Sequence, residues 1–367
     1  MEESEIKLTR KISPYKIIYP ILIGLAVVSY MLYKEFDITS FQQITFTWTS
    51  VWWLLVAILC MVVRDLGYII RIRVLSGGRL NWIKSIRIIF LWEFTSAVTP
   101  SAIGGTSLAI LFVNKEGIKV GRSSAMVMAT SFLDEFYFIL MFPIILLSVS
   151  QSALWNMPGV NEGVSKSLIW FAVGGYSIKL AYLAILSYGL FKNPRGLKYL
   201  LMKCFKLKIL RKWRHSANEA GSDIVRNSYE LRHMPFSFWL KTFGATFLSW
   251  TARYWVVNAI LMAFWAGHYN WATQFLIFAR QLVMWIMMLI SPTPGGSGFA
   301  EFVFKEYLGE FLPSAGVAIA MAMLWRLITY YPYLFAGVLI VPKWVNKHFG
   351  GCSGKKSGIT QSANQKS

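Results

Sequence analysis

The chain has 367 residues, of which 56% are hydrophobic and only 15% are charged, and its mean hydropathy is +0.49. This composition lies outside the range of soluble proteins and indicates an integral membrane protein. The net charge of +20 could suggest nucleic-acid binding, but no such motif occurs and the basic residues lie in loops between apolar segments. Basic loops of this kind set membrane topology and attract anionic headgroups. We therefore expect a membrane lipid, and no nucleic acid, as partner.

Long apolar segments predict about six membrane-spanning helices. Each is long enough to cross a hydrocarbon core of roughly 30 Å. The predicted spans are residues 17–33, 49–70, 123–149, 167–191, 238–266 and 314–341. The predicted fold class is therefore an all-α polytopic membrane bundle, in a single transmembrane domain over residues 1–349. The remaining segment, 350–367, is rich in Gly, Ser, Lys and Gln and is expected to be a disordered cytoplasmic tail.

Two further apolar segments, 86–114 and 274–309, are interrupted by proline and paired glycine. The interruptions read TPSAIGGTSLA at 99–109 and PTPGGSGFA at 292–300. Proline removes a backbone donor and glycine adds chain freedom, so both break helices. A 13-residue arm such as 86–98 reaches only about 20 Å, too short to cross alone. We therefore predict two re-entrant hairpins, each entering and leaving on one side.

The basic residues are distributed unevenly between the predicted loops. With a cytoplasmic N-terminus, 28 of the 37 Lys and Arg residues lie in cytoplasmic segments, whereas the outer loops hold only Lys34, Lys166 and Lys305. The positive-inside rule then places both termini in the cytoplasm of a multi-pass protein of the inner membrane. In this topology the first hairpin enters from the cytoplasm and the second from outside.

Each hairpin and its flanking spans form a unit, about 49–149 and 238–341, and the two units are inverted. Inverted repeats place substrate sites near the bilayer midplane and permit alternating access. A chance likeness between two Gly- and Pro-rich turns is the alternative, since both residues are common in membrane helices. The basic insert 192–236 suits either a helix on an anionic leaflet or a solvated connector.

The hairpin tips are predicted to bind an anionic headgroup. Short helices that start at mid-depth present unpaired backbone N–H groups and a partial positive charge. We expect the second arms to start after Gly105 and Gly296, with Thr106 and Ser297 as N-caps. Alternatively, the glycine pairs only allow close helix packing. That alternative explains the glycines but not the flanking prolines.

Ionisable residues deep in the predicted spans complete the predicted site. A charge at the bilayer centre costs at least roughly 2.5–3.5 kcal/mol, so each needs a partner or a function. Asp134 and Arg326 occupy nearly corresponding positions of the two units, where they could face one another or a shared cavity. For each charge, an ion pair that locks helices together is the alternative. The predicted substrate-binding residues are Pro100, Gly104, Gly105, Thr106, Asp134, Arg253, Arg280, Pro294, Gly295, Gly296, Ser297, Glu301 and Arg326.

Neither a cofactor nor a catalytic site is predicted. The three cysteines are isolated, the four histidines lack metal-ligand spacing, and no nucleotide-binding or nucleophile motif occurs. We expect no metal, no cofactor and no enzymatic activity. A proton gradient could drive transport through Asp134 or Glu301.

Several motifs resemble the flippase-like transmembrane region of lysylphosphatidylglycerol synthases, a family that also contains free-standing membrane proteins. PTPGGSGFAE at 292–301 is similar to its Pro-Thr-Pro-Gly-Gly-x-Gly-x-x-Glu hairpin, and WRLITYY at 325–331 is similar to its Tyr-Arg-Leu-x-Thr-Tyr-Trp span. Thr106 and Ala109 stand where the family often has an acidic residue and an arginine, and Asp134 alone remains of its Glu-Arg-x-x-Asp motif. An arginine clamp from the first unit is therefore not expected.

The resemblance implies translocation of a phospholipid, or of a modified or glycosylated lipid, between leaflets. Because the chain ends soon after its last span, we expect no aminoacyl-transfer domain. A lipid-modifying enzyme as partner and a homo-oligomer are both compatible with this interpretation. The alternatives are a secondary transporter of a small soluble ion or metabolite and an accessory subunit of a lipid- or glycan-modifying system. A cavity that opens sideways to the lipid would favour the flippase. A cavity closed to the lipid would favour the transporter of a soluble substrate.

Overall fold

The computed structural model describes most of the chain between residues 44 and 349. The described residues are 33, 44–98, 102–155, 162–204, 206, 218, 222, 225, 229, 231–265, 270–288, 296 and 298–349. Almost all of the predicted first span (17–33) and the whole predicted tail (350–367) lie outside these residues.

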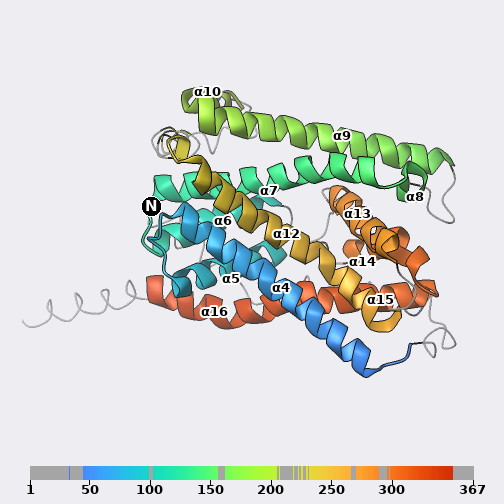
Figure 1. Cartoon of the computed structure of the whole chain (residues 1–367). Coiled ribbons are helices and arrows are strands. Elements are labelled where there is room, and N and C mark those ends of the chain that lie inside the picture. The colour runs from blue at the N-terminus through green and yellow to red at the C-terminus, as the bar shows by residue number, and fades with distance from the viewer. Residues whose placement is uncertain are drawn as a thin grey trace, which may run out of the picture.

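The described chain is helical, and none of its residues forms a strand (Figure 1). Its first half contains α4 (Trp48–Leu75), α5 (Trp82–Val98), α6 (Ala102–Lys115), α7 (Val120–Ser148), α8 (Gln151–Trp155), α9 (Glu162–Ser187), the π-helical turn η1 (Tyr188–Lys192) and α10 (Pro194–Cys204). Its second half contains α12 (Phe236–Trp265), α13 (Trp271–Met287), α14 (Phe299–Leu308), the 3₁₀ turn η6 (Gly309–Phe311), α15 (Ala315–Thr329) and α16 (Tyr331–Phe349). The predicted all-α class is confirmed.

Several segments are long and apolar enough to cross a bilayer. They are Trp48–Leu75, Val120–Ser148, Ile169–Lys192 and Ala315–His348. Each overlaps a predicted span, which confirms the multi-pass membrane bundle. The predicted span 238–266 forms α12, whose 30 residues extend about 45 Å. The count of six spans stays a prediction.

Local sequence signals fix where several helices begin. The Thr47 and Ser50 side chains form a reciprocal capping box at the start of α4. Asn270 caps α13 and Ser314 caps α15 through their side-chain oxygens. These caps satisfy backbone donors that would otherwise stay unpaired at the helix ends.

The segment predicted as one span, 314–341, is divided at Tyr330 into α15 and α16. Tyr330 departs from helical geometry, with φ −125° and ψ −54°. Pro332 follows in the first turn of α16. A proline lacks an N–H group and its ring clashes with the carbonyl four residues earlier, so it weakens a continuous helix and is tolerated best in the first turn of a new one. Pro143 and Pro342 are accommodated inside α7 and α16, whereas at Pro332 the chain starts a new helix.

Helices α4 and α12 form the central pair, packed against each other along their length and running in opposite directions. Arg71, near the end of α4, contacts Thr246 in the first half of α12. Trp53, near the start of α4, lies across a cavity from Met262, near the end of α12. The two helices therefore place the elements that follow them at opposite ends of the bundle.

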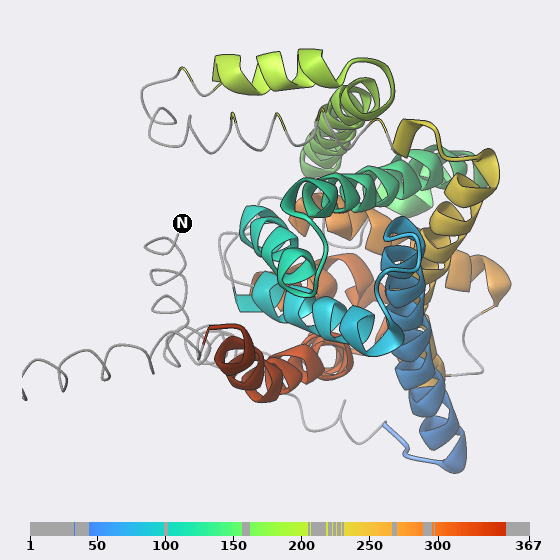
Figure 2. The ribbon, with the colours of Figure 1, turned by 90° about the vertical axis from the view of Figure 1, so that its left-hand side faces the viewer.

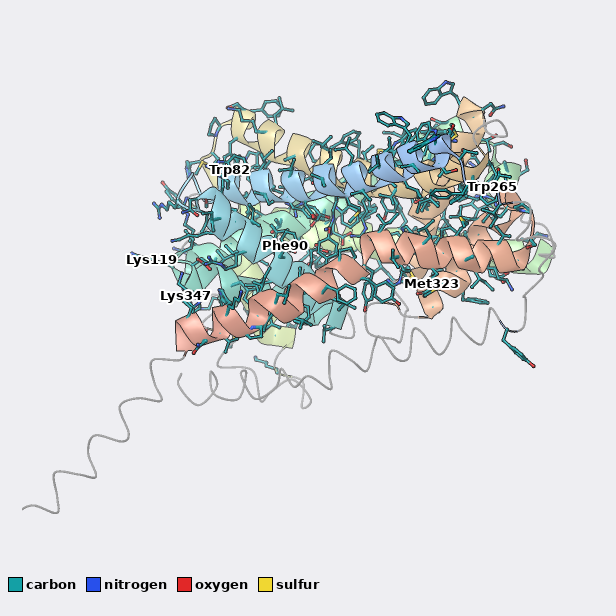
Figure 3. All side chains as sticks on the ribbon, turned by 90° about the horizontal axis from the view of Figure 1, so that it is seen from below. Trp82, Phe90, Lys119, Trp265, Met323 and Lys347 are labelled. Carbon is teal, nitrogen blue, oxygen red and sulfur yellow. The ribbon has the colours of Figure 1, made fainter. Side chains whose placement is uncertain are left out.

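Those elements are the two predicted hairpins. The arms α5 and α6 follow α4 and pack against each other, and α13 and α14 do the same after α12. In Figure 1 the first hairpin lies toward the left and the second toward the right. Lys119 and Lys347 lie at the first hairpin's end of the bundle and Trp265 at the other (Figure 3). This arrangement is the one expected of two inverted units, although the unit boundaries and the orientation in the membrane stay predictions.

The remaining helices lie around this frame. Helix α9 packs on α7, and α16 packs on α5. Helix α10, which begins the predicted basic insert, runs across the end of α9 instead of continuing it (Figure 2). Its strongly amphipathic sequence is compatible with a place on a membrane surface.

Large apolar side chains on the outside of α4 form a lipid-facing surface. Trp52, Leu55, Leu59, Leu66 and Ile70 are all exposed. Successive members of this set are three, four or seven residues apart, and this spacing keeps them on one side of the helix. The opposite side packs into the bundle.

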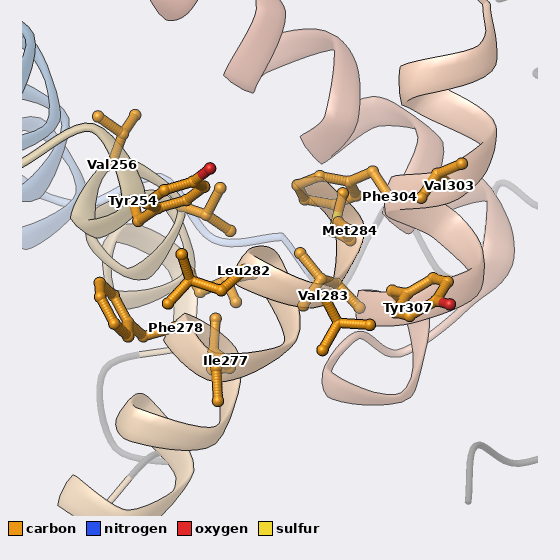
Figure 4. Packing of buried hydrophobic residues seen from close by; sticks show 14 of the residues in the cluster. Tyr254, Val256, Ile277, Phe278, Leu282, Val283, Met284, Val303, Phe304 and Tyr307 are labelled. Atoms are coloured by element: carbon orange, nitrogen blue, oxygen red, sulfur yellow. The ribbon is translucent and has the colours of Figure 1, made fainter. Parts of the chain in front are cut away.

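Apolar side chains from α12, α13 and α14 interlock in the largest core cluster (Figure 4).

The central pair depends on a close approach at Gly67. A Cβ atom there would collide with the Ser249 hydroxyl and would lie 2.7 Å from the backbone oxygen of Ala245. Ser249 also donates a hydrogen bond to the Arg64 carbonyl at 2.9 Å. A small residue is therefore required for the backbones of α4 and α12 to meet, as is common between membrane helices.

We predict that Gly67→Ala destabilises the protein by about 1–3 kcal/mol, because the backbone of α12 cannot yield locally. The matched control is Gly244→Ala on α12, where a Cβ atom would meet nothing within 4 Å. That variant is expected to be neutral or stabilising by up to about 1 kcal/mol. Thermal unfolding midpoints in detergent measure both. Equal midpoints for the two variants would contradict the close packing of α4 on α12.

Candidate functional site

A cavity of about 160 Å³ lies among α12, α13, α14 and α15. We call it the central cavity. Its lining includes Arg253, Gln281, Trp285, Ala300, Arg326 and Tyr330. Arg253 lies twelve residues before the end of α12, or about 18 Å along the helix axis. The cavity is therefore far from both ends of α12 and next to the start of α14, the second arm of the second hairpin.

One wall of the central cavity is fixed by an ion pair between α14 and α15. Nε of Arg326 donates to Oε1 of Glu301 at 3.1 Å, and both side chains are buried. The other oxygen of Glu301 accepts from the backbone N–H of Gly298 at 2.8 Å, which caps the start of α14. Gly298 has φ +80°, a conformation that favours glycine. The Arg326 guanidinium also lies over the Tyr330 ring, 3.8 Å from its centroid. These contacts tie the second hairpin to α15.

Arg253 differs from the other deep arginines. Among the residues that the structure describes, its guanidinium forms no ion pair and only lies 5.6 Å from the centroid of the Trp250 ring. The central cavity therefore has two guanidinium groups on its wall, and Glu301 balances one of them. The described lining therefore carries a net positive charge.

Asp134, the ionisable residue predicted for the site in the first unit, has its partners within the protein. Asp134 on α7 forms a two-pronged ion pair with Arg71 on α4. Trp250 on α12 donates its Nε1–H to Asp134 at 2.7 Å, and Arg71 donates to the Thr246 hydroxyl at 3.2 Å. The pair thus joins three helices. These contacts favour the structural alternative for Asp134, and no described contact joins Asp134 to Arg326.

A second buried cluster joins α4, α5 and α16. Arg64, which is 1% exposed, contacts Asp65 at 2.8 Å and Glu93 at 2.6 Å. The Tyr333 hydroxyl lies 2.8 Å from Asp65 and accepts from Arg64 at 3.0 Å. One guanidinium therefore holds two carboxylates and ties the first arm of the first hairpin to its neighbours.

The other deep charges are paired as well. Lys179 on α9 contacts both oxygens of Glu135 on α7, at 2.8 and 2.7 Å, and lies 3.5 Å from the centroid of the Trp285 ring. Arg280 on α13 pairs with Glu310 at 2.9 Å. Arg280 also donates to the backbone carbonyls of Ala153 and Tyr307. It therefore joins α8 and α14 to α13, and it does not line the central cavity.

The first hairpin differs in detail from the prediction. Thr106 is not an N-cap, because α6 begins at Ala102 and places Thr106 in its second turn. Gly105 is buried against Ser96 of α5, where a Cβ atom would collide with the serine hydroxyl. Close packing of the two arms therefore explains Gly105. Gly104 also lies inside α6, and Pro100 lies outside the described residues.

Both arms of the second hairpin are described, whereas most of its tip lies outside the described residues. Gly296 is buried with φ +70°, and Gly298 is the N-cap of α14 in place of the predicted Ser297, so this arm begins one residue later than predicted. Pro294, Gly295 and Ser297 lie outside the described residues.

Of the predicted site residues, the structure thus brings Arg253 and Arg326 together at the central cavity. Glu301 contacts Arg326 there. Sequence reasoning missed the rest of the lining, including Gln281 and Trp285. It also missed a buried amide cluster, in which Asn258 contacts both Gln274 and Gln281. A signal was available: Gln274 and Gln281 are seven residues apart, which places them on one face of an otherwise apolar helix.

These features define a multi-pass α-helical membrane protein with charged clusters at its helix junctions and a cationic cavity at its second hairpin. The family described as "Lysylphosphatidylglycerol synthase TM region" matches residues 17–337. A "UPF0104 membrane protein" from Archaeoglobus fulgidus is 27% identical over 334 residues, which cover 88% of this chain and 94% of the relative. The chain belongs to the lysylphosphatidylglycerol synthase transmembrane-region family, so the resemblance seen in its motifs is confirmed.

We predict that the pair between Arg71 and Asp134 is structural. Arg71→Met alone leaves the partly buried Asp134 carboxylate without its cation and is expected to destabilise the protein by about 1–3 kcal/mol. The double variant Arg71→Met/Asp134→Leu is expected to recover most of that loss, because no buried charge remains unpaired. Thermal unfolding midpoints of the wild type, both single variants and the double variant measure the coupling. Additive losses would contradict the pair.

Proposed function

We propose that the protein translocates a lipid with an anionic, phosphate-bearing headgroup between leaflets, and that Arg253 and Arg326 receive the headgroup in the central cavity. The observation that carries the proposal is the net positive charge of the described cavity lining. The family supports a role connected with membrane lipids. In this proposal the protein acts by transport and not by catalysis.

The electrostatic argument starts from the cost of an unbalanced charge. An ionised group in hydrocarbon is stable only with a partner or with access to water. Arg253 lacks a carboxylate partner within the described chain. A phosphate group would supply the missing negative charge, and guanidinium groups bind phosphate oxygens through paired, charge-assisted hydrogen bonds. Arg253 is then the primary ligand, while Arg326 is already oriented by Glu301.

The size of the central cavity supports a divided binding mode. Its volume of about 160 Å³ is below that of pockets which enclose a drug-sized molecule. A headgroup fits such a volume, whereas two acyl chains do not. The chains would stay in the surrounding lipid while the polar group passes through the protein. The same cavity could accept a small soluble anion, so the experiment includes that alternative.

The test uses purified protein in phosphatidylcholine vesicles. These vesicles contain phosphatidylglycerol that carries a fluorescent label and keeps its headgroup intact. Dithionite added outside the vesicles destroys only the label in the outer leaflet. The slow phase of fluorescence loss that follows therefore reports translocation of labelled lipid from the inner to the outer leaflet. We expect faster loss with wild-type protein than in empty vesicles. Arg253→Gln is expected to lower the protein-dependent rate roughly tenfold or more, since one charge-assisted hydrogen bond is worth about 1.5–3 kcal/mol.

Two control variants sharpen this test. Arg253→Lys keeps the positive charge and is expected to retain part of the rate. Lys343→Gln removes the same charge at an exposed position of α16 and is expected to have no effect. If folded wild-type protein accelerates no lipid, or if Arg253→Gln is as active as the wild type, the proposal fails. Uptake of radiolabelled inorganic phosphate without any lipid movement would favour the soluble-anion transporter instead.

A further inference from the structure

A groove of about 270 Å³ lies between α5 and α16, at the Lys- and Arg-rich end of the bundle. We call it the surface groove. Lys347, which lies at the same end of the bundle as Lys119, marks its position in Figure 3. The groove is lined by Arg87 from α5 and by Leu339, Ile340, Lys343, Trp344 and Lys347 from α16. It shares none of these residues with the central cavity, so the two are separate sites.

Three cationic side chains line the surface groove. Lys343 and Lys347 are exposed and lie four residues apart on α16, which places them on one face of the helix. Arg87 reaches the groove from α5, and 27% of its side chain is exposed. The buried carboxylate of Glu116 accepts from Nη1 of Arg87 at 2.7 Å and balances that charge. The two lysines therefore give the described walls of the groove a net positive charge.

Glu116 also fixes the shape of the surface groove. Its Oε1 accepts from Nε1–H of Trp344 at 3.2 Å, and Trp344 packs edge-on against the Phe112 ring. Lys84 on α5 donates to the backbone carbonyl of Glu116 at 2.9 Å. One residue directly after α6 therefore holds the walls that α5 and α16 contribute. Side chains that are held in place before a ligand arrives lose less freedom when it binds.

The order of side chains along α16 matches the order of groups in a phospholipid. Phe335 and Leu339 are each 67% exposed and apolar, and Lys343 and Lys347 follow at the same four-residue spacing. The strip from Phe335 to Lys347 extends about 18 Å along the helix. It ends with the lysines at the end of the apolar segment Ala315–His348. An acyl chain beside this strip would place its headgroup next to the lysines.

Charge selects the class of lipid. Ammonium and guanidinium groups bind phosphate oxygens through charge-assisted hydrogen bonds. Basic pockets between membrane helices bind anionic headgroups in this way. A zwitterionic headgroup such as phosphatidylcholine carries a cation of its own, which the lysines would repel. A free phosphate ion would meet the same cations but would make no use of the apolar strip.

We propose that the surface groove holds an anionic phospholipid that stays bound and is not transported. Its phosphate contacts Arg87 and the two lysines, and one acyl chain lies along Leu339 and Phe335. The lipid thereby joins α5 of the first hairpin to α16. The proposal does not rest on translocation through the central cavity. For the same reason Lys343→Gln is not expected to slow translocation, because the groove lipid does not pass through that cavity.

The test places the photoreactive residue benzoylphenylalanine at Leu339 or, as a matched control, at Leu66. Both positions are exposed, and they lie ten residues before the end of α16 and nine before the end of α4. Each protein is illuminated in nanodiscs with equal amounts of phosphatidylglycerol and phosphatidylcholine of matched chains, and mass spectrometry counts the attached lipids. At Leu339 we expect phosphatidylglycerol to exceed phosphatidylcholine at least about fivefold, the effect of one basic residue at a membrane surface. At Leu66 we expect nearly equal amounts.

The charges of the groove are then removed in the protein labelled at Leu339. Lys343→Gln/Lys347→Gln is expected to lower the preference to the value at Leu66, because Glu116 already balances the remaining cation. Arg253→Gln is expected to leave the preference unchanged, which separates the surface groove from the central cavity. Thermal unfolding midpoints show that each variant is folded.

The same lipid ratio at Leu339 and at Leu66 would overturn the proposal. A preference at Leu339 that persists in the folded double variant would do so as well. Attachment of position 339 mainly to another protein segment, or to a second copy of the chain, would instead assign the groove to a protein contact. If the wild type translocates no lipid but shows the expected preference at Leu339, the proposed function fails and the lipid site stands.

Discussion

The pairing of buried charges is the physical constraint on which this structure depends. In a membrane, an ion without a partner is costly, and a long apolar helix offers it no water. Each of the clusters around Arg64, Arg71, Lys179, Arg280 and Arg326 joins at least two helices. The charges therefore act as junctions that fix which helices meet and at what depth. Against this background, the lack of a carboxylate partner for Arg253 within the described chain is informative.

The geometry of the second hairpin explains why Arg253 lies at a cavity. Helix α14 starts inside the bundle, where Gly298 and Glu301 satisfy its first backbone groups. The same carboxylate orients Arg326 on α15. The central cavity lies beside the start of α14, and Arg253 on α12 lines it. A broken helix is tolerated in a membrane only where protein or a polar cavity receives its end. The hairpin and the cationic cavity are thus parts of one arrangement.

The sequence predicted the elements well and their contacts poorly. Helix α7, predicted over 123–149, spans Val120–Ser148, because a long apolar run leaves few alternatives. The break at Tyr330 was missed, although Pro332 marks it. Thr106 was wrongly expected to cap α6, since a Gly-Gly pair does not reveal which residue starts the helix. The pairing of Arg71 with Asp134 joins residues 63 positions apart, and no local pattern could select it over other partners.

The most direct measurement is an experimental structure of the protein in nanodiscs that contain phosphatidylglycerol, at a resolution that reveals phosphate groups. The account predicts a headgroup phosphate within hydrogen-bonding distance of the Arg253 guanidinium, with Arg326 on the same side of the cavity and still bound to Glu301. Arg253 paired with a protein carboxylate, or anionic lipid bound only elsewhere while the central cavity holds water, would contradict it.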